Sequence, residues 1–269
     1  MTDPTTSNPI THIIMFSGGV QSYVAAKRIV EKNDPAACRL LFTDTKMEDA
    51  DCYRFLAEAS ATLKIPLITI AEGRTPWQVY RDEKFLGNWQ KDPCSKILKR
   101  QLARSWMQQH CPDTATTIVI GFDATEGHRF AASRRGWWPY NVAFPLLYPP
   151  LLDKCQMLAI TKNDGLRPQR LYELGFTHSN CGGFCCKAGL QHYRHLLAQL
   201  PEVYAYHEQQ EIDLQNYLNY DATFLVMQRD GVKNRLTMRT YRMMIETGDL
   251  PHNDDEWGGC ACFAPNDTD

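Results

Sequence analysis

Residues 10–22 read ITHIIMFSGGVQS. The first seven are mostly apolar and β-branched, which predicts a buried strand that ends at Ser17. Two glycines then allow a sharp turn, and residues 20–32 have the pattern of a helix. A strand, a glycine turn and a helix N-terminus together form a place where backbone N–H groups and the helix dipole can bind an anion.

The loop Ser17–Ser22 is therefore a predicted phosphate site, in which the Ser17 and Ser22 hydroxyls can donate hydrogen bonds to phosphate oxygens. The other members of the loop are Gly18, Gly19, Val20 and Gln21. The loop matches neither GxxxxGK[ST] nor GxGxxG, which argues against a P-loop kinase or GTPase and against a dinucleotide-binding loop. A plain strand–helix turn with a serine cap is the structural alternative.

Three more strands are expected downstream, at residues 39–43, 67–70 and 117–121. Amphipathic helices over residues 49–63 and 95–109 separate them. Strands that alternate with helices imply right-handed βαβ units, so we expect an α/β fold with an open parallel, Rossmann-like sheet and helices on both faces. Ligands of such sheets bind at the carboxyl ends of the strands, where the loop lies.

The pattern changes beyond about residue 130. Residues 136–152 read GWWPYNVAFPLLYPPLL and predict an extended crossing segment, followed by helices over 166–175 and 187–220. We expect a nucleotide-binding α/β domain over residues 1–165 and a small, helical, cysteine-bearing C-terminal subdomain over residues 166–269.

The composition is that of an ordinary globular protein, with 269 residues, 43% hydrophobic residues and a formal charge of −2. No apolar run approaches the roughly 20 residues of a membrane span, and the first residues lack a signal-peptide pattern. We therefore expect a cytoplasmic protein with no membrane partner. Local basic stretches at 91–104 and 229–242, with Trp137 and Trp138, could contact a nucleic acid, or could be solvated helix faces and core tryptophans.

Further segments in chain order resemble the PP-loop (adenine nucleotide α-hydrolase-like) superfamily. They are Phe42-Thr43-Asp44-Thr45, Pro93-Cys94-Ser95-Lys96 with Leu98-Lys99, Gly121 to Arg129, and Pro168…Leu171-Tyr172…Gly175-Phe176 leading into Cys181 and Cys185. These are similar, in this order, to the F-x-D-T, Cys…Leu-Lys, G-x-R-x-x-E-S-x-x-R and P-x-x-x-Y-x-x-G-F elements of the sulfonucleotide reductase branch. The resemblance covers roughly residues 10–190 and is to the phosphoadenosine phosphosulfate (PAPS) reductases and DNA-phosphorothioation sulfurtransferases.

The chain departs from this family pattern at several positions. Gln21 stands where ATP pyrophosphatases usually carry Asp, and Asp123 and Gly127 stand where the family often has Arg and Ser. The C-terminal Glu-Cys-Gly-x-His nucleophile of the reductases is missing, and the tail carries Cys260 and Cys262 instead.

The resemblance implies an adenine nucleotide, ATP or PAPS, over the loop, with Mg²⁺ as the companion of ATP. The residues that it places at the nucleotide, besides Ser17 to Ser22, are Asp44, Thr45, Lys96, Lys99, Gly121, Glu126 and Arg129. Asp44 would bind magnesium or orient the nucleotide, and Ser17 would assist departure of pyrophosphate. Lysine and arginine side chains would neutralise triphosphate or sulfate charge.

Ten cysteines in a chain without an export signal favour metal or redox chemistry over disulfides. A four-ligand set could comprise Cys94, Cys181, one of Cys185 and Cys186, and one of Cys260 and Cys262. Four cysteines suit a 4Fe–4S cluster or structural zinc, and the resemblance favours iron. Cys260 and Cys262 could instead form a catalytic thiol pair that carries sulfur as a persulfide.

Three functions follow as alternatives. The first is a sulfurtransferase that uses ATP α-phosphate chemistry, an iron–sulfur cluster, a sulfur donor and a nucleic-acid (tRNA or DNA) or nucleotide acceptor. The second is a PAPS-type sulfonucleotide reductase in which Cys260 or Cys262 is the nucleophile and a thioredoxin-like protein the reductant. The third is a non-catalytic, redox-sensing module that binds a nucleotide or nucleic acid.

Overall fold

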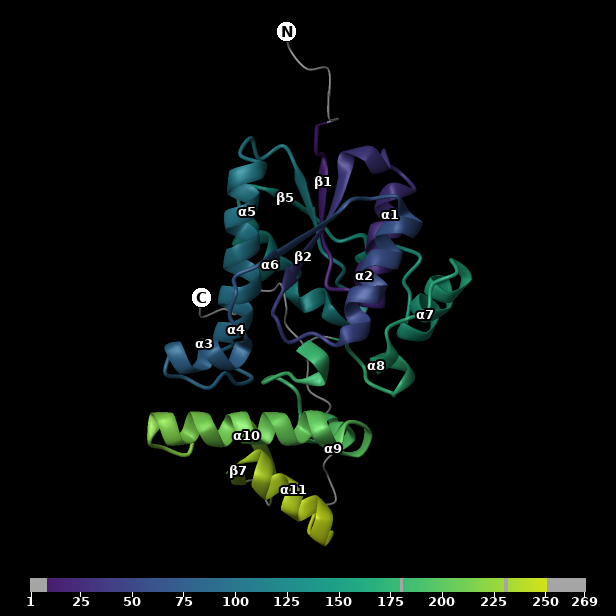
Figure 1. Ribbon diagram of the computed structural model, residues 1–269. Helices are drawn as coiled ribbons and strands as arrows, with labels where there is room; N and C mark the ends of the chain where they lie inside the picture. Colours follow the sequence, from purple (N-terminus) through teal and green to yellow (C-terminus); the bar gives the residue numbers. More distant parts are fainter. Residues whose placement is uncertain (1–8, 180, 230–231, 251–269) are drawn as a thin grey trace.

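A five-stranded parallel sheet forms the centre of the molecule, in the order β3-β2-β1-β4-β5 (Figure 1). Its strands are β1 (His12–Met15), β2 (Cys38–Asp44), β3 (Leu67–Ala71), β4 (Thr117–Val119) and β5 (Asn141–Ala143). The computed structural model describes residues 9–179, 181–229 and 232–250. The four expected strands and their parallel arrangement are confirmed, and β5 is a fifth strand inside the proline-rich crossing segment.

The central strand β1 explains why the opening run of the sequence is almost continuously apolar. Its Ile14 packs with helices α1 (Val20–Val30) and α2 (Ala50–Leu63) on one face of the sheet. The neighbouring Ile13 and Met15 pack on the other face, where helices α5 (Leu102–His110) and α6 (Phe130–Trp137) lie. Because both faces of a parallel sheet are covered, the successive side chains Ile13, Ile14 and Met15 of β1 are all buried.

The strand order changes direction between β1 and β4. From β1 the chain moves outward to β2 and β3, and it then crosses back to add β4 and β5 on the other side. In an open α/β sheet, the crevice at the carboxyl ends of the strands beside such a switch point is the usual ligand site. The Ser17–Ser22 loop leaves β1 at this position.

The helix expected over 95–109 consists of three pieces. The short helix α4 (Pro93–Ser95) continues into a π-helical segment, η2 (Lys96–Gln101), and then into α5. π-Helical turns are rare and are frequent at functional sites. This one carries the predicted nucleotide ligands Lys96 and Lys99.

Short elements complete the α/β part of the chain. They are η1 (Pro35–Ala37), α3 (Pro76–Asp82), η3 (Ala124–Arg129), η4 (Pro145–Leu147) and α7 (Lys154–Asn163). Both α3 and α7 begin with a capping box, in which the side chains of Thr75 with Gln78 and of Asp153 with Gln156 bond reciprocally to the backbone. α7 packs against α1.

A helical layer lies below the carboxyl edge of the sheet in Figure 1. The helix expected over 187–220 is two helices, α9 (Leu190–Gln199) and α10 (Pro201–Leu218), because Pro201 begins the second one. The helix expected over 166–175 is limited to α8 (Arg170–Glu173), and η5 (Cys181–Gly183) follows it. Trp77 and Tyr80 of α3 share a core with the buried aromatic side chains of this layer, which include Phe184, Tyr193, Tyr204 and Tyr241.

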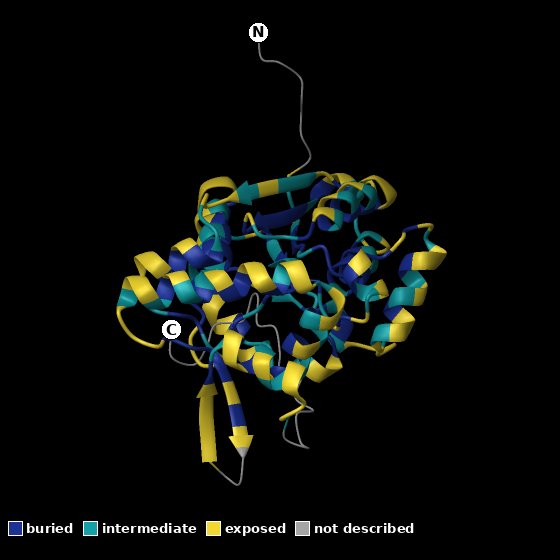
Figure 2. Ribbon diagram, turned by 60° about the horizontal axis from the view of Figure 1, so that its bottom comes forward, coloured by how far each residue is buried: buried dark blue, intermediate teal, exposed yellow. Residues whose placement is uncertain are grey.

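The sequence did not indicate the last described elements. An antiparallel hairpin, β6 (Leu225–Arg229) and β7 (Val232–Leu236), projects from the body of the molecule (Figure 2) and precedes α11 (Met238–Thr247). Among the described residues, no helix has both the length and the apolar character that crossing a membrane requires.

A buried carboxyl group joins α10 to α11. Glu211 is fully buried; its Oε2 accepts a hydrogen bond from the Met238 backbone N at 2.6 Å, and its Oε1 has no hydrogen-bond partner among the described residues. Burial raises the pKa of Glu211 to about 8, although the bond from Met238 opposes the shift. The carboxyl group is therefore largely protonated at neutral pH.

We expect the free energy of unfolding to fall as the pH rises from about 5 to beyond 8, because folding requires Glu211 to keep a proton that the unfolded chain releases near its ordinary pKa of about 4.3. The variant Glu211→Gln cannot ionise, so at pH 9 it should exceed the wild type by roughly 2–4 kcal/mol. Urea unfolding at pH 5.5, 7 and 9 measures this difference. Asp213→Asn, at an exposed position of the same helix, is the matched control, and parallel pH profiles for Glu211→Gln and the wild type would contradict the expectation.

Candidate functional site

The Ser17–Ser22 loop wraps around the N-terminus of α1. Gly18 has φ +79°, a left-handed conformation that glycine adopts without strain, and Gly19 is the N-cap residue of the helix. The Ser22 hydroxyl donates a hydrogen bond to the Gly19 carbonyl at 2.7 Å, so it holds the loop in shape. Val20 is the first helical residue and Ser17 is half-buried at the strand end. This is the arrangement of an anion site at a helix N-terminus.

A distant segment, residues 168–179, packs directly on the two glycines. Gln169 is fully buried; its Nε2 donates to the Gly18 carbonyl at 2.6 Å, and its Oε1 accepts from the Ser179 hydroxyl. A Cβ atom at Gly18 would lie 2.8 Å from Gln169 Nε2, and one at Gly19 would lie 3.0 Å from the Tyr172 hydroxyl. Both positions therefore require glycine, because the side chains of Gln169 and Tyr172 lie too close to the backbone for a Cβ atom. The sequence reasoning missed Gln169, for which the only signal was its place between Pro168 and Tyr172.

The loop after β4 forms the other wall of the site. A Cβ atom at Gly121 would lie 3.1 Å from the Gln21 carbonyl oxygen, so a glycine permits this contact. The Gln21 amide Nε2 donates to Asp123 Oδ2 at 2.6 Å and lies 3.4 Å from Glu126 Oε2. Arg129 donates to Glu126 Oε1. The structure thus brings the predicted residues Gly121, Glu126 and Arg129 to the predicted loop.

The pKa values of the two carboxyl groups of this wall are shifted in opposite directions. Burial raises the pKa of Asp123, but hydrogen bonds from Thr125 and Gln21 outweigh it and bring that pKa below its ordinary value. For Glu126 burial dominates and raises the pKa, although the positive charge of Arg129 opposes it. Asp123 is the firmly anionic member of the pair.

Lys154, the first residue of α7, lies over the same loop. Its Nζ donates to Gln21 Oε1 at 3.2 Å and lies 5.4 Å from the centre of the Tyr172 ring. The Tyr172 hydroxyl in turn accepts a hydrogen bond from the backbone N of Val20 at 3.4 Å. Burial lowers the pKa of the nearby His178 to about 4, and the charge of Lys154 adds to this, so His178 is neutral at pH 7. No motif in the sequence indicated Lys154.

An ionised carboxylate ends the neighbouring strand β2. Asp44 is buried; its Oδ1 accepts from Lys46 N at 2.8 Å and Tyr53 Oη at 2.9 Å, and its Oδ2 accepts from Lys46 Nζ at 2.8 Å. Burial raises the pKa of Asp44, but these hydrogen bonds together bring it below its ordinary value. The predicted nucleotide or magnesium ligand is therefore an anion at the carboxyl edge.

The Cys181 thiol lies beside Thr45, the residue that follows β2. Its Sγ is 3.8 Å from Lys99 Nζ and 4.0 Å from Thr45 Oγ1. Glu48 supports the group: its Oε1 accepts from Thr45 Oγ1 at 2.9 Å and its Oε2 from the Cys181 backbone N at 2.6 Å. Lys99 is buried and forms an ion pair with Glu48 at 3.8 Å. Lys96, at the start of the π-helical segment, is half-buried.

Cys94 and Cys186 form a second thiol group. The Tyr80 hydroxyl donates to Cys94 Sγ at 3.0 Å. A hydrogen bond between the two thiols lowers the pKa of Cys94 and raises that of Cys186, since it favours Cys94 as the thiolate. Cys185 is half-buried, and its backbone N donates to the Tyr193 hydroxyl at 3.3 Å.

The predicted metal ligands are not gathered into one set within the described part of the chain. There, no group of three or more His, Cys, Asp or Glu side chains is arranged to hold a metal ion. The described cysteines instead supply a pair, Cys94 with Cys186, and Cys181 beside Lys99. Cys260 and Cys262 lie outside the described residues.

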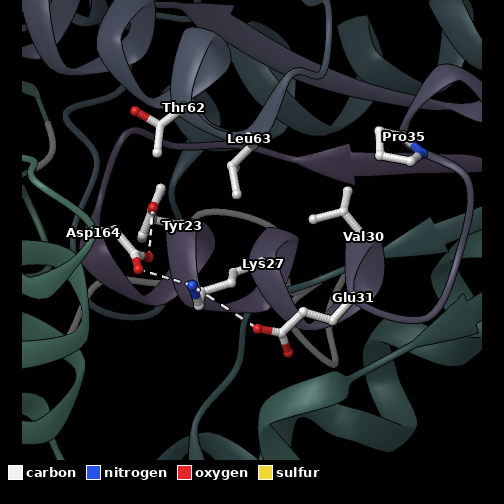
Figure 3. Close-up of a pocket in the computed structure, with 8 residues that line it drawn as sticks. All are labelled: Tyr23, Lys27, Val30, Glu31, Pro35, Thr62, Leu63 and Asp164. Carbon is white, nitrogen blue, oxygen red and sulfur yellow. Dashed lines mark hydrogen bonds and ion pairs between the residues drawn. The ribbon is translucent and has the colours of Figure 1, made fainter.

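An open cavity of about 320 Å³ lies elsewhere (Figure 3). Tyr23 Oη and Lys27 Nζ both donate to the Asp164 carboxylate at 2.8 Å on its wall. The cavity is lined by the last turns of α1 and α2 and by the residue after α7. Those helix ends lie at the amino edge of the sheet, so this cavity is separate from the anion loop.

A glycine loop at the carboxyl end of β1 in an open parallel sheet is an α/β architecture that fits the PP-loop superfamily. The chain belongs to the phosphoadenosine phosphosulfate reductase domain family, whose family model matches residues 11–182. The resemblance found in the sequence is thereby confirmed, and this family consists of enzymes.

The solved structures that match the chain are distant. A phosphoadenylyl-sulfate (PAPS) reductase from Candida auris, in complex with phosphate, is 13% identical with a TM-score of 0.45, covering 65% of this chain and 82% of that one. The NMN synthetase from Francisella tularensis is 18% identical with a TM-score of 0.40, covering 60% of this chain and 63% of that one. No curated protein matches the sequence significantly.

We expect Gly18→Ala to destabilise the protein by roughly 2–4 kcal/mol, because its methyl group would overlap Gln169 and Cys52. Gly165→Ala is the matched control, since φ is +81° there and no atom lies within 4 Å of the added methyl group. The control carries only the cost of the left-handed conformation, about 1 kcal/mol. Urea unfolding of the two variants compares them, and equal losses would contradict the close approach at Gly18.

Proposed function

We propose that this protein is a nucleotide-dependent sulfurtransferase that binds Mg–ATP over the Ser17–Ser22 loop and uses its α-phosphate to activate an acceptor. The observation that carries the proposal is the position of a thiol beside a buried lysine at the end of β2, adjacent to an anion loop at the end of β1. An enzyme that couples departure of pyrophosphate to attack by sulfur needs these two parts at one edge of the sheet.

In the first step, an oxygen of the acceptor attacks the α-phosphorus of ATP and pyrophosphate leaves. The backbone N–H groups at the start of α1 and the Ser17 hydroxyl would stabilise the leaving pyrophosphate electrostatically. Mg²⁺ accompanies ATP as part of the substrate and commonly takes only one or two protein carboxylates besides phosphate oxygens. Asp44 and Asp123, both with lowered pKa values, are the anionic candidates for this contact.

In the second step, sulfur displaces the adenylated oxygen. A lysine ammonium group favours the reactive, anionic form of a neighbouring sulfur, and Lys99 occupies that position beside Cys181. A persulfide on Cys181 would attack the activated carbon, the C–O bond would break and AMP would leave. The remaining disulfide between the acceptor and Cys181 would be reduced by the dithiol of a thioredoxin-like protein, which releases the thiolated acceptor and the Cys181 thiol.

An iron–sulfur cluster, or zinc in its place, stays a prediction. Of the predicted ligands, Cys94 and Cys186 would supply two thiolates and one of Cys260 and Cys262 a third, whereas Cys181, the fourth member of the predicted set, carries the persulfide in the step above. Such a cluster would hold or deliver sulfide. Neither of the two steps above depends on this cluster.

The acceptor in this proposal is a nucleic acid or a nucleotide. Of the two tryptophans considered for stacking on bases, only Trp138 is accessible, since it is 75% exposed and Trp137 is 4% exposed. Lys233 and Arg235 on the projecting hairpin are exposed cations that suit a phosphate backbone.

A sulfonucleotide reductase is the second candidate, and the family match over residues 11–182 favours it. Gln21 also makes the loop more similar to that of the PAPS reductases. In this function Cys260 or Cys262 would attack the sulfur of PAPS, and a thioredoxin-like protein would then release sulfite. Sulfite from PAPS would indicate the reductase, pyrophosphate from ATP the sulfurtransferase, and tight binding without turnover a redox-sensing module.

The double variant Ser17→Ala, Gly19→Ala should lose pyrophosphate release from ATP by at least about 100-fold, because it removes a donor and places a methyl group against Tyr172. An enzyme-coupled pyrophosphate assay with tRNA or DNA as acceptor measures the rate. Gly165→Ala, which lies away from the loop, should keep the wild-type rate, whereas an unaffected double variant would exclude the proposed site.

Cys181→Ser should still bind ATP but should not accept sulfur. After incubation with a cysteine desulfurase and cysteine, peptide mass spectrometry should detect one added sulfur atom on Cys181 in the wild type. Cys155→Ser, at an exposed cysteine on α7, is the control and should be loaded normally. Loading of the wild type at other cysteines only would contradict the role of Cys181.

A further inference from the structure

Three features converge on the ammonium group of Lys154. It donates to the side chain of Gln21, a member of the anion loop, at 3.2 Å. It lies over the ring of Tyr172, whose hydroxyl contacts the backbone N of Val20. Its side chain is only half-buried and starts from the first turn of α7, so its flexible stem can move between neighbouring positions.

Lys99, which its motif predicts to neutralise phosphate, makes its contacts at the end of β2 and not with the side chain of Gln21. Lys99 is buried in the group formed by Glu48 and Cys181 at the end of β2. On the described wall of the loop, Asp123 is anionic and Arg129 is bound to Glu126. A pyrophosphate group brought beside Asp123 requires a compensating positive charge, because like charges repel strongly in a partly buried site.

We propose that Lys154 is the phosphate-binding cation of the loop, held on Gln21 when the site is empty and transferred to a phosphate oxygen when pyrophosphate or a nucleotide binds. This rests on the proposed nucleotide site and adds the residue that recognises the charge of its ligand. Gln21 is suited to the first task because its amide has both a donor and an acceptor: Oε1 accepts from Lys154 while Nε2 donates to Asp123.

The side chain at position 21 thereby connects two opposite charges without carrying one. An aspartate at that position would form an ion pair with Lys154 and would repel Asp123, whereas the neutral glutamine holds Lys154 weakly enough to release it. The Tyr172 ring provides a second weak contact for the ammonium group through its π face. Both contacts are made with neutral groups, so a hydrogen-bonded ion pair with an anionic phosphate oxygen can replace them.

Calorimetric titration of the full-length protein with inorganic pyrophosphate, ATP and adenosine tests the proposal. The variants are Lys154→Met and Lys154→Arg, with Lys162→Met as control, because Lys162 is an exposed lysine in the last turn of the same helix. We expect Lys154→Met to weaken pyrophosphate and ATP binding at least about ten-fold and to leave adenosine binding unchanged, since one charge-assisted hydrogen bond is lost. Lys154→Arg should recover part of the affinity, and Lys162→Met should bind like the wild type.

Two outcomes would overturn the inference, and they differ from each other. If the wild type binds pyrophosphate and Lys154→Met binds it within two-fold, the loop stands as an anion site and Lys154 is not its cation. If the wild type binds neither pyrophosphate nor ATP, the proposed nucleotide function fails and the role of Lys154 fails with it. A loss of adenosine binding in Lys154→Met alone would indicate that this variant misfolds. Lys154→Arg, which keeps the charge, then decides: measurable pyrophosphate binding, even if weaker than that of the wild type, supports the cation, and lost binding contradicts it.

Discussion

The hydrogen bond from Gln169 to the Gly18 carbonyl is the contact on which the rest of the site depends. It joins a turn at the start of the chain to a segment about 150 residues later, and it does so at Gly18, where the main chain has no Cβ to keep the two apart. Gln169 is also bound by Ser179, so the segment that leads to Cys181 is fixed by the same side chain. The position of the thiol relative to the anion loop is a consequence of this contact.

The charged side chains at the carboxyl edge form two groups, one at the ends of β1 and β4 and the other at the end of β2. At the end of β1 and β4, Gln21 lies between Lys154 and Asp123. At the end of β2, Lys99 and Glu48 surround Cys181. The helical layer lies below this edge in Figure 1, and at the edge Lys99 is buried and Cys181 is half-buried. A low-dielectric setting strengthens each interaction of this kind, and it also makes any unpaired charge costly.

The cysteines illustrate why spacing along the chain could not assign their roles. Cys181 and Cys186 are five positions apart, but the turn through Gly182 and Gly183, both at positive φ, directs them to different neighbours. Cys181 meets Lys99 and Thr45, whereas Cys186 meets Cys94. A close contact of Gly182 with the Met47 carbonyl fixes this turn, since a Cβ atom there would lie 2.9 Å from that oxygen.

The sequence by itself determined the parallel sheet, the strands β1 to β4 and the anion loop. Each of these depends on a local pattern, which is an apolar run, a pair of glycines at a turn or a helical periodicity. It also indicated the family through motifs in chain order. It missed β5 and the hairpin, because short or exposed strands give weak signals. It also missed the division of the long C-terminal helix at Pro201. Only the tertiary structure decided the partners of the site, Gln169, Tyr172 and Lys154, because their role comes from contacts between segments more than 130 residues apart, and no local pattern encodes such contacts.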